Sequence, residues 1–101
     1  MIINKLVRDN IPKIIEKQGN KCSYKILNNE EYNQALNEKL KEELNEYLES
    51  ESIEELADLQ EVINAILQFK GVDKTTFEQI REEKCLKNGS FSQRIYLLEK
   101  R

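Results

Sequence analysis

The sequence predicts an all-α protein, and three observations support that fold class. Two long central stretches carry apolar side chains at the spacing of an amphipathic helix. Each helical stretch is bounded by a polar capping residue, a glycine or both. Charged residues make up 35% of the chain and the mean hydropathy is negative, which is typical of a soluble, helix-rich protein. The 101 residues correspond to a single domain, residues 1–101.

The first helix is expected to begin after Asp9 or Asn10 and to end near Gly19, because a proline at position 12 is tolerated in a first helical turn. Residues 22–27 are a short strand candidate. Residues 91–98 are apolar enough to dock as an extended strand. The fold class therefore leaves room for a small β-hairpin beside the helices.

The two central helices should form an antiparallel helical hairpin. The first is expected at residues 29–50, after a cap at Asn28 or Asn29, and the second at residues 52–70, before Gly71. Apolar positions define one face of each helix. These positions are Tyr32, Leu36, Leu40, Leu44, Tyr47 and Leu48 in the first helix, and Leu56, Leu59, Val62, Ile63 and Ile66 in the second.

A fourth helix is expected to open with the capping box Thr75-Thr76-Phe77-Glu78 and to end at Asn88-Gly89. The core of such a protein is thin, since a chain of this size buries only about 60–70% of its unfolded surface. A second copy would supply the four apolar faces of a four-helix bundle. We therefore expect a homodimer or a dimer of dimers, with a monomer closed by its own first and fourth helices as the alternative.

Two acidic motifs lie on the central helices, Glu42-Glu43-Leu44-Asn45-Glu46 and Glu55-Leu56-Ala57-Asp58. Carboxylates three residues apart share a helical face, so two antiparallel helices could direct four carboxylates at one point. Hard divalent cations such as Mg²⁺ prefer oxygen ligands of this kind, often beside substrate phosphates. Glu55 projects into the apolar face of its helix and Asp58 lies at its edge, where an acid is costly unless it is paired or binds metal.

Most of these acids also have a structural interpretation. Glu55 completes a capping box at the start of its helix. Glu43 could pair with Lys39 one turn earlier, and Glu42 points away from the apolar stripe, as a solvated residue would. No cap or first-turn role explains Asp58, and the joint pattern favours a metal site more strongly than any single acid does.

The residues that are absent restrict the chemistry. The chain has no histidine, which excludes Ser-His-Asp and Cys-His catalysis and imidazole ligation of a metal. It has no GxGxxG or P-loop pattern, so lysine, arginine and a metal would bind any phosphate. Cys22 and Cys85 are too few for a disulfide framework or a zinc site, which favours a reducing cytoplasm. No apolar run is long enough to cross a bilayer, and the N-terminus lacks the apolar core of a signal peptide.

Charge is distributed unevenly along the chain. Residues 26–62 carry two basic and twelve acidic side chains, whereas residues 1–25 carry six basic and two acidic, and residues 63–101 eight basic and five acidic. Such a chain can bind cations at its acidic centre and anionic groups at its rim. The acidic centre would repel a phosphate backbone, so nucleic acid is not an expected partner. A membrane is not expected either, because no apolar run could cross one.

The order of the motifs, EExxE and then ExxD on successive helices, resembles the MazG-like all-α nucleoside triphosphate pyrophosphohydrolase superfamily, which includes phosphoribosyl-ATP pyrophosphohydrolases and dimeric dUTPases. The resemblance extends over most of the chain. Residues 4–12 (NKLVRDNIP) and 84–91 (KCLKNGSF) look like a small branch of house-cleaning pyrophosphatases. The stretch after Asp58 lacks the aromatic residue common in MazG itself, which leaves the recognised base open.

The resemblance implies hydrolysis between the α- and β-phosphates of a non-standard nucleoside triphosphate, releasing monophosphate and pyrophosphate. Mg²⁺, or alternatively Mn²⁺, would neutralise phosphate charge and help to generate the hydroxide nucleophile. By position, the implied metal ligands are Glu43, Glu46, Glu55 and Asp58. Glu42 is implied as a catalytic residue beside Glu43, orienting water or a ligand. The candidates for phosphate contacts are Lys5, Arg8 and Lys84.

Two other functions remain open from the sequence. An enzyme that acts on phosphoribosyl-ATP in histidine synthesis would share the same metal site. A non-enzymatic helical dimerisation module would explain the amphipathic helices and treat the acids as solvated surface. The positions of Glu55 and Asp58 on or beside an apolar face argue against that module.

Overall fold

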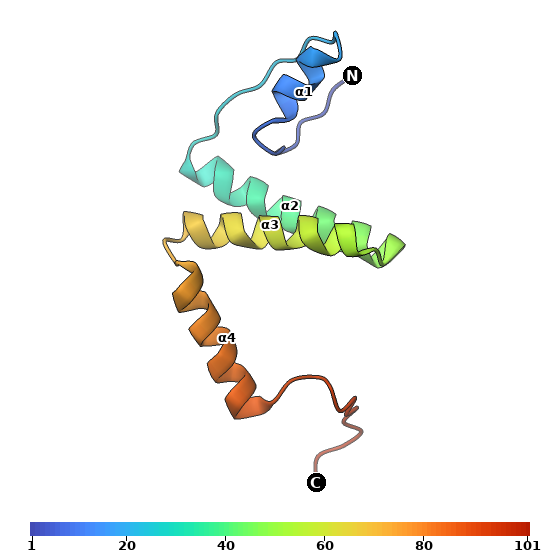
Figure 1. Ribbon diagram of the computed structural model, residues 1–101, viewed down its shortest axis with the longest axis vertical. Helices are drawn as coiled ribbons and strands as arrows, with labels where there is room; N and C mark the ends of the chain where they lie inside the picture. The colour runs from blue at the N-terminus through green and yellow to red at the C-terminus, as the bar shows by residue number, and fades with distance from the viewer.

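The structure is a computed structural model that describes residues 1–101, and it contains four helices and no strand (Figure 1). The helices are α1 (Ile11–Lys17), α2 (Asn29–Ser50), α3 (Ile53–Phe69) and α4 (Lys74–Asn88). Helices α2 and α3 run side by side in opposite directions, whereas α1 and α4 lie towards opposite ends of the molecule. The predicted all-α class is therefore confirmed.

The prediction of a small β-hairpin is wrong. Residues 22–27 form an irregular connection between α1 and α2, and residues 91–98 form an irregular tail at the other end of the molecule (Figure 1). Most of their large apolar side chains are exposed, namely Tyr24, Ile26, Phe91, Ile95, Tyr96, Leu97 and Leu98, and only Leu27 is partly covered. An isolated pair of strands is marginal in water without an apolar surface to pack on, and neither segment has such a surface.

The boundaries of α2 and α3 follow from their capping residues. Asn28 Oδ1 accepts a hydrogen bond from the N–H of Glu31 at 2.9 Å, and the Glu31 carboxylate accepts one from the N–H of Asn28 at 3.2 Å. Glu51 then adopts a left-handed φ of 54°, and Ser52 caps α3 by accepting from the N–H of Glu55. This short turn sets the two helices antiparallel, as the sequence predicts.

The predicted capping box at Thr75 is wrong, because α4 begins earlier. Asp73 is the N-cap residue, and its carboxylate accepts a hydrogen bond from the N–H of Thr76 at 2.7 Å. Aspartate is at least as good an N-cap as threonine, and here it precedes Thr75 in the chain. Glu78 pairs with Arg81 instead of folding back onto the cap.

The packed core is small and lies between α2 and α3. Its buried hydrophobic residues are Leu36 and Val62, and Glu43 is buried with them. The accessible surface is 9684 Å², whereas about 6,000 Å² is expected for a compact monomer of this mass. The radius of gyration of 18.0 Å likewise exceeds the ~13 Å expected for this length. The chain is therefore far more open than a compact domain.

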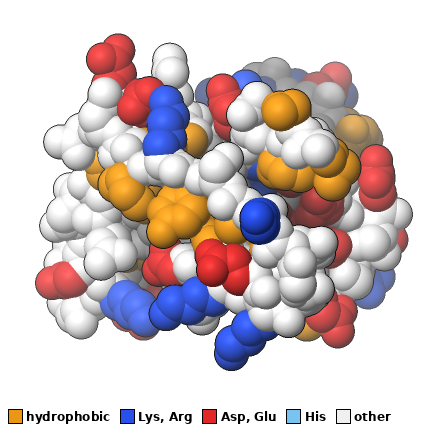
Figure 2. All heavy atoms as spheres, turned by 90° about the horizontal axis from the view of Figure 1, so that it is seen from above, with side chains coloured by type: hydrophobic (Ala, Val, Ile, Leu, Met, Phe, Trp, Pro, Cys, Tyr) orange, Lys and Arg blue, Asp and Glu red, His pale blue; other side chains and the backbone are white.

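Part of the apolar stripe of the hairpin is uncovered. Leu44, Leu48 and Leu56 are 44%, 62% and 40% exposed. Figure 2, which views the molecule from above Figure 1, shows hydrophobic side chains at the surface with acidic and basic side chains around them. Helix α4 leads away from the hairpin (Figure 1). The first and fourth helices therefore do not close a bundle within one chain.

Candidate metal centre

Three of the predicted metal ligands meet between α2 and α3. Glu43 comes from α2, and Glu55 and Asp58 come from the start of α3, three residues apart on one face. One carboxylate oxygen from each residue lies within 4.8 Å of the other two. The antiparallel hairpin thus brings the two acidic motifs together.

The carboxylates of Glu43 and Glu55 each have an oxygen with no partner. Glu43 is 7% exposed, and both its Oε2 atom and the Oε2 atom of Glu55 are buried without a hydrogen bond. A buried polar group that is left unpaired costs about 1–3 kcal/mol, and more when it is charged. Two such oxygens in one cluster indicate a site whose ligand would satisfy them.

Capping explains the contact made by the backbone of Glu55 but not the position of its side chain. Ser52 Oγ accepts a hydrogen bond from the backbone N–H of Glu55 at 3.4 Å. The Glu55 carboxylate makes no return bond to the cap, and one of its oxygens is buried and unpaired. The backbone of Glu55 therefore has a structural role, whereas its side chain is directed to the acidic cluster.

Burial and mutual repulsion shift the titration of the cluster. Burial raises the pKa of Glu43 above its ordinary value, the charge of Glu46 raises it further, and Lys39 opposes the shift. The pKa of Glu55 is also raised, by burial first and then by the charges of Glu46 and Asp58. Glu46 thus acts on both acids, although its own side chain is exposed and its oxygens are not among the three that converge.

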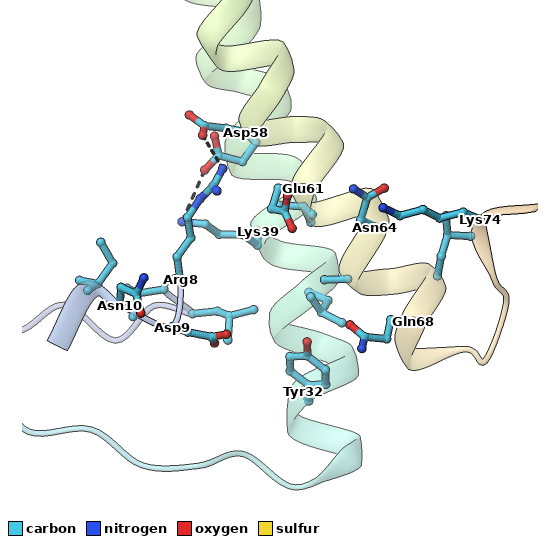
Figure 3. Close-up of a pocket in the computed structure, with 18 of the residues that line it drawn as sticks. Arg8, Asp9, Asn10, Tyr32, Lys39, Asp58, Glu61, Asn64, Gln68 and Lys74 are labelled. Carbon is cyan, nitrogen blue, oxygen red and sulfur yellow. Dashed lines mark hydrogen bonds and ion pairs between the residues drawn. The ribbon is translucent and has the colours of Figure 1, made fainter. Parts of the chain in front are cut away.

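Basic side chains border the acids. Lys39 Nζ lies 3.2 Å from Glu42 Oε2 and 3.5 Å from Glu43 Oε1. The pair between Lys39 and Glu43 is therefore formed, but it leaves Oε2 of Glu43 free. Arg8 Nη2 lies 2.7 Å from Asp58 Oδ1 (Figure 3). The cluster is thus partly neutralised from two sides.

Glu42 is half-buried, not solvated as its place on the helix suggested. Its carboxylate lies between Lys39 and Lys5, and Lys5 Nζ is 3.2 Å from Oε1. Although burial raises it, the hydrogen bonds from the two lysines bring the pKa of Glu42 below its ordinary value. Sequence reasoning treated Lys39 only as a partner of Glu43, yet its spacing of three residues from Glu42 was an available signal.

The structure brings Lys5 and Arg8 to the acids but not Lys84. Lys5 and Arg8 belong to the non-helical segment before α1, and their partners lie 37 and 50 positions away on the hairpin. Lys84 is exposed on α4, which leads away from the hairpin (Figure 1). Of the three predicted phosphate contacts, only Lys5 and Arg8 would therefore lie close to a phosphate bound at the acids of this chain.

A pocket of about 1000 Å³ adjoins the acidic cluster. It lies between the N-terminal segment and the α2–α3 hairpin, and Glu43 and Asp58 are part of its wall. The other polar residues that line it are Arg8, Asp9, Asn10, Tyr32, Lys39, Glu61, Asn64, Gln68, Asp73 and Lys74 (Figure 3). Sequence reasoning did not predict the amide groups of this pocket, because segments distant in sequence create it. It is a groove open to solvent, and its volume lies at the upper end of the range of small-molecule sites.

The donor set of the cluster fits a hard divalent cation. Every converging donor is a carboxylate oxygen, and two buried oxygens of the cluster have no hydrogen-bond partner. Mg²⁺ and Mn²⁺ prefer oxygen donors of this kind. Glu43, Glu55 and Asp58 could hold such an ion, with Glu46 as the nearest further acid.

Comparison of the chain with models of known protein families, with curated proteins and with solved structures finds no match. None of the four helices is both long enough and apolar enough to cross a membrane.

Proposed function

We propose that this protein is a Mg²⁺-dependent nucleoside triphosphate pyrophosphohydrolase of the MazG-like type, which cleaves between the α- and β-phosphates and releases nucleoside monophosphate and pyrophosphate. The observation that carries the proposal is the buried carboxylate of Glu43, which has an unpaired oxygen and converges with Glu55 and Asp58. Carboxylates held close together, one of them buried, repel one another. A bound cation offsets that cost and gives the arrangement a function.

The residues around the cluster support distinct roles. Bound Mg²⁺ would supply charge neutralisation for the polyphosphate and activation of water. The three converging acids would hold the ion, with Glu46 beside them. Glu42, kept ionised by Lys5 and Lys39, would orient the attacking water. Arg8 stands at the edge of the same acids and would contact the phosphates bound there.

The adjoining pocket supports a nucleotide as the substrate. It combines apolar side chains with the amide groups of Asn10, Asn64 and Gln68, which can donate hydrogen bonds to a base and accept them from it. The acids form part of the same pocket, so a triphosphate at the metal would leave its nucleoside inside it. The cleavage between the α- and β-phosphates rests on the resemblance of the two acidic motifs, and house-cleaning of non-standard nucleotides rests on that of residues 4–12 and 84–91.

We infer that the working unit is a homodimer or a dimer of dimers. The chain exposes roughly 3,700 Å² more surface than a compact monomer of its mass, which is more than the roughly 1,000–2,500 Å² per chain that obligate dimers commonly bury. The uncovered residues Leu44, Leu48 and Leu56 support an interface on the hairpin. Two hairpins packed through this face would complete a four-helix bundle.

A panel of nucleoside triphosphates tests the activity, with phosphoribosyl-ATP included and with Mg²⁺ present or chelated. We expect pyrophosphate and monophosphate from at least one compound, and no product without the cation. Asp58→Asn should lower the rate by orders of magnitude. Glu49→Gln removes the same charge from an exposed position of α2 and should retain activity. Release of orthophosphate would contradict the proposal, and a protein that only dimerises would release neither product.

A further inference from the structure

Two basic side chains of the N-terminal segment, residues 1–10, form ion pairs with acids at the candidate metal centre. Arg8 pairs with Asp58 and Lys5 pairs with Glu42. Neither basic residue belongs to the hairpin that carries the acids. Their place at the cluster therefore depends on the position of a non-helical segment, whereas Lys39 is fixed on α2 itself.

Lys5 and Arg8 provide partners for only some of the carboxylate oxygens. Arg8 bonds to one oxygen of Asp58, but the Oε2 atoms of Glu43 and Glu55 remain buried and unpaired. A divalent cation among the three acids would satisfy those oxygens and would compete with Arg8 for Asp58. The positive charge of Arg8 repels a free cation at this position but attracts a polyphosphate.

Arg8 is free to change partners. Its side chain is 57% exposed and that of Asp58 is 43% exposed, and an ion pair in such a setting is weak. Lys39 is different, because its side chain is only 20% exposed. The planar guanidinium also matches phosphate oxygens with two parallel hydrogen bonds, and Arg8 already lines the pocket beside the acids.

We propose that Arg8 is a phosphate-binding residue that exchanges partners: it holds Asp58 in the cation-free protein and moves to the polyphosphate of the substrate when the cation binds. This inference rests on the proposed function and deepens it. Arg8 opposes the binding of free Mg²⁺ and favours the binding of Mg²⁺ with polyphosphate, so the site selects the complex over the free ion. Lys5 acts in the same direction but less strongly, because Glu42 is not among the converging acids.

Calorimetric titration of the full-length protein tests the exchange, with Mg²⁺ alone and with Mg²⁺ plus inorganic tripolyphosphate. Arg8→Gln should bind free Mg²⁺ about two- to fivefold more tightly, because an exposed ion pair no longer competes. It should bind Mg²⁺–tripolyphosphate roughly tenfold or more weakly, because a charge-assisted contact to phosphate is lost. Lys5→Gln should show smaller changes of the same signs. Arg94→Gln removes an arginine from the tail, far along the chain, and should change neither affinity.

The opposite signs of the two changes distinguish exchange from a purely structural role, which would weaken both affinities together. Arg8→Lys keeps the charge but loses the planar fork, so it should retain the Mg²⁺ affinity and lose much of the tripolyphosphate affinity; it also serves if Arg8→Gln does not fold. Changes of the same sign in Arg8→Gln, or no change, would overturn the exchange while leaving the proposed function intact. A wild-type protein that binds Mg²⁺ in neither form would overturn both.

Discussion

The α2–α3 hairpin and the two ends of the chain differ in what covers their side chains. All three buried residues, Leu36, Glu43 and Val62, belong to the hairpin. Helices α1 and α4 contain no buried residue, and Leu98 in the tail is 87% exposed. Contacts within one chain therefore fully bury residues of the hairpin, whereas they bury no residue of the two ends.

This difference separates two parts of the candidate site. The converging acids lie on packed helices, so their geometry is set before any ligand arrives. Arg8 and Lys5 lie on a segment outside the hairpin and reach the acids through exposed ion pairs. The comparison predicts a rigid place for the cation and adjustable contacts for the phosphates.

The largest expected effect concerns the hairpin core. Leu36→Ala should lower the free energy of unfolding by about 2–5 kcal/mol, because it leaves a cavity between α2 and α3. Leu86→Ala on α4, where the side chain is 88% exposed, should change it by less than about 0.5 kcal/mol. Urea unfolding of both variants measures the contrast. Equal losses would show that α4 is packed as firmly as the hairpin.

Local signals in the sequence were sufficient for most of the helices. The caps at Asn28 and Ser52 were predictable, because each makes its hydrogen bond within three residues. The predicted start of α4 failed where two capping residues, Asp73 and Thr75, lie close together and the earlier one is used. Helix existence thus followed from periodicity, whereas one boundary depended on competition between neighbouring caps.

The convergence of Glu43, Glu55 and Asp58 was also predictable, because carboxylates on facing sides of two antiparallel helices can meet, although Glu46, the fourth predicted ligand, is not among them. The half-burial of Glu42 was not, because one of its two partners is Lys5, 37 positions away. The pocket formed by Asn10, Asn64 and Gln68 was missed for the same reason. Contacts made by a non-helical segment across a hairpin leave no periodic pattern in the sequence.

The second largest expected effect concerns self-association of the chain. Leu48→Glu on the uncovered stripe should weaken self-association at least about tenfold, because burying a leucine is worth about 1.5–3 kcal/mol. Ile26→Glu, at an 87% exposed position in the α1–α2 connection, should leave association unchanged. Sedimentation at micromolar concentration measures both variants beside the wild type. A wild-type monomer under these conditions would contradict the inferred dimer.

The acidic cluster should also make the cation-free protein less stable as pH rises. The pKa of Glu55 is raised above its ordinary 4.5, so the folded state binds more protons than the unfolded state between that value and the raised one. The free energy of unfolding then falls as pH rises through this window, and the destabilisation reaches its full size above the raised pKa. Glu55→Gln should melt above the wild type at neutral pH and lose this advantage as the pH falls towards 4.5.

Glu54→Gln is the matched control for this titration, since Glu54 is the exposed neighbour in the same first turn of α3. Its melting temperature relative to the wild type should not follow the same pH dependence. Thermal melts from neutral to acidic pH measure all three proteins. A difference between Glu55→Gln and the wild type that stays constant with pH would show that Glu55 is not held in a repulsive cluster.

The smallest expected effect is that of Glu42→Gln. Glu42 contacts lysines and is not one of the converging acids, so its loss should reduce pyrophosphate release much less than Asp58→Asn does. The affinity for Mg²⁺ should change little. Initial rates at saturating Mg²⁺ check the order of the two variants. A larger loss of activity in Glu42→Gln than in Asp58→Asn would show that Glu42 contributes more to the reaction than the proposed metal ligand does.

The most direct measurement is the melting temperature of Glu43→Gln with and without Mg²⁺, beside the wild type and Glu49→Gln. Glu43 is the buried acid with an unpaired oxygen, and glutamine keeps its shape without its charge. The metal-centre account predicts that the variant melts at the same temperature as the cation-free wild type, or higher, since repulsion is relieved. It also predicts that Mg²⁺ stabilises the wild type and Glu49→Gln but not Glu43→Gln. A Glu43→Gln protein that melts lower and keeps its Mg²⁺-dependent shift would contradict the account.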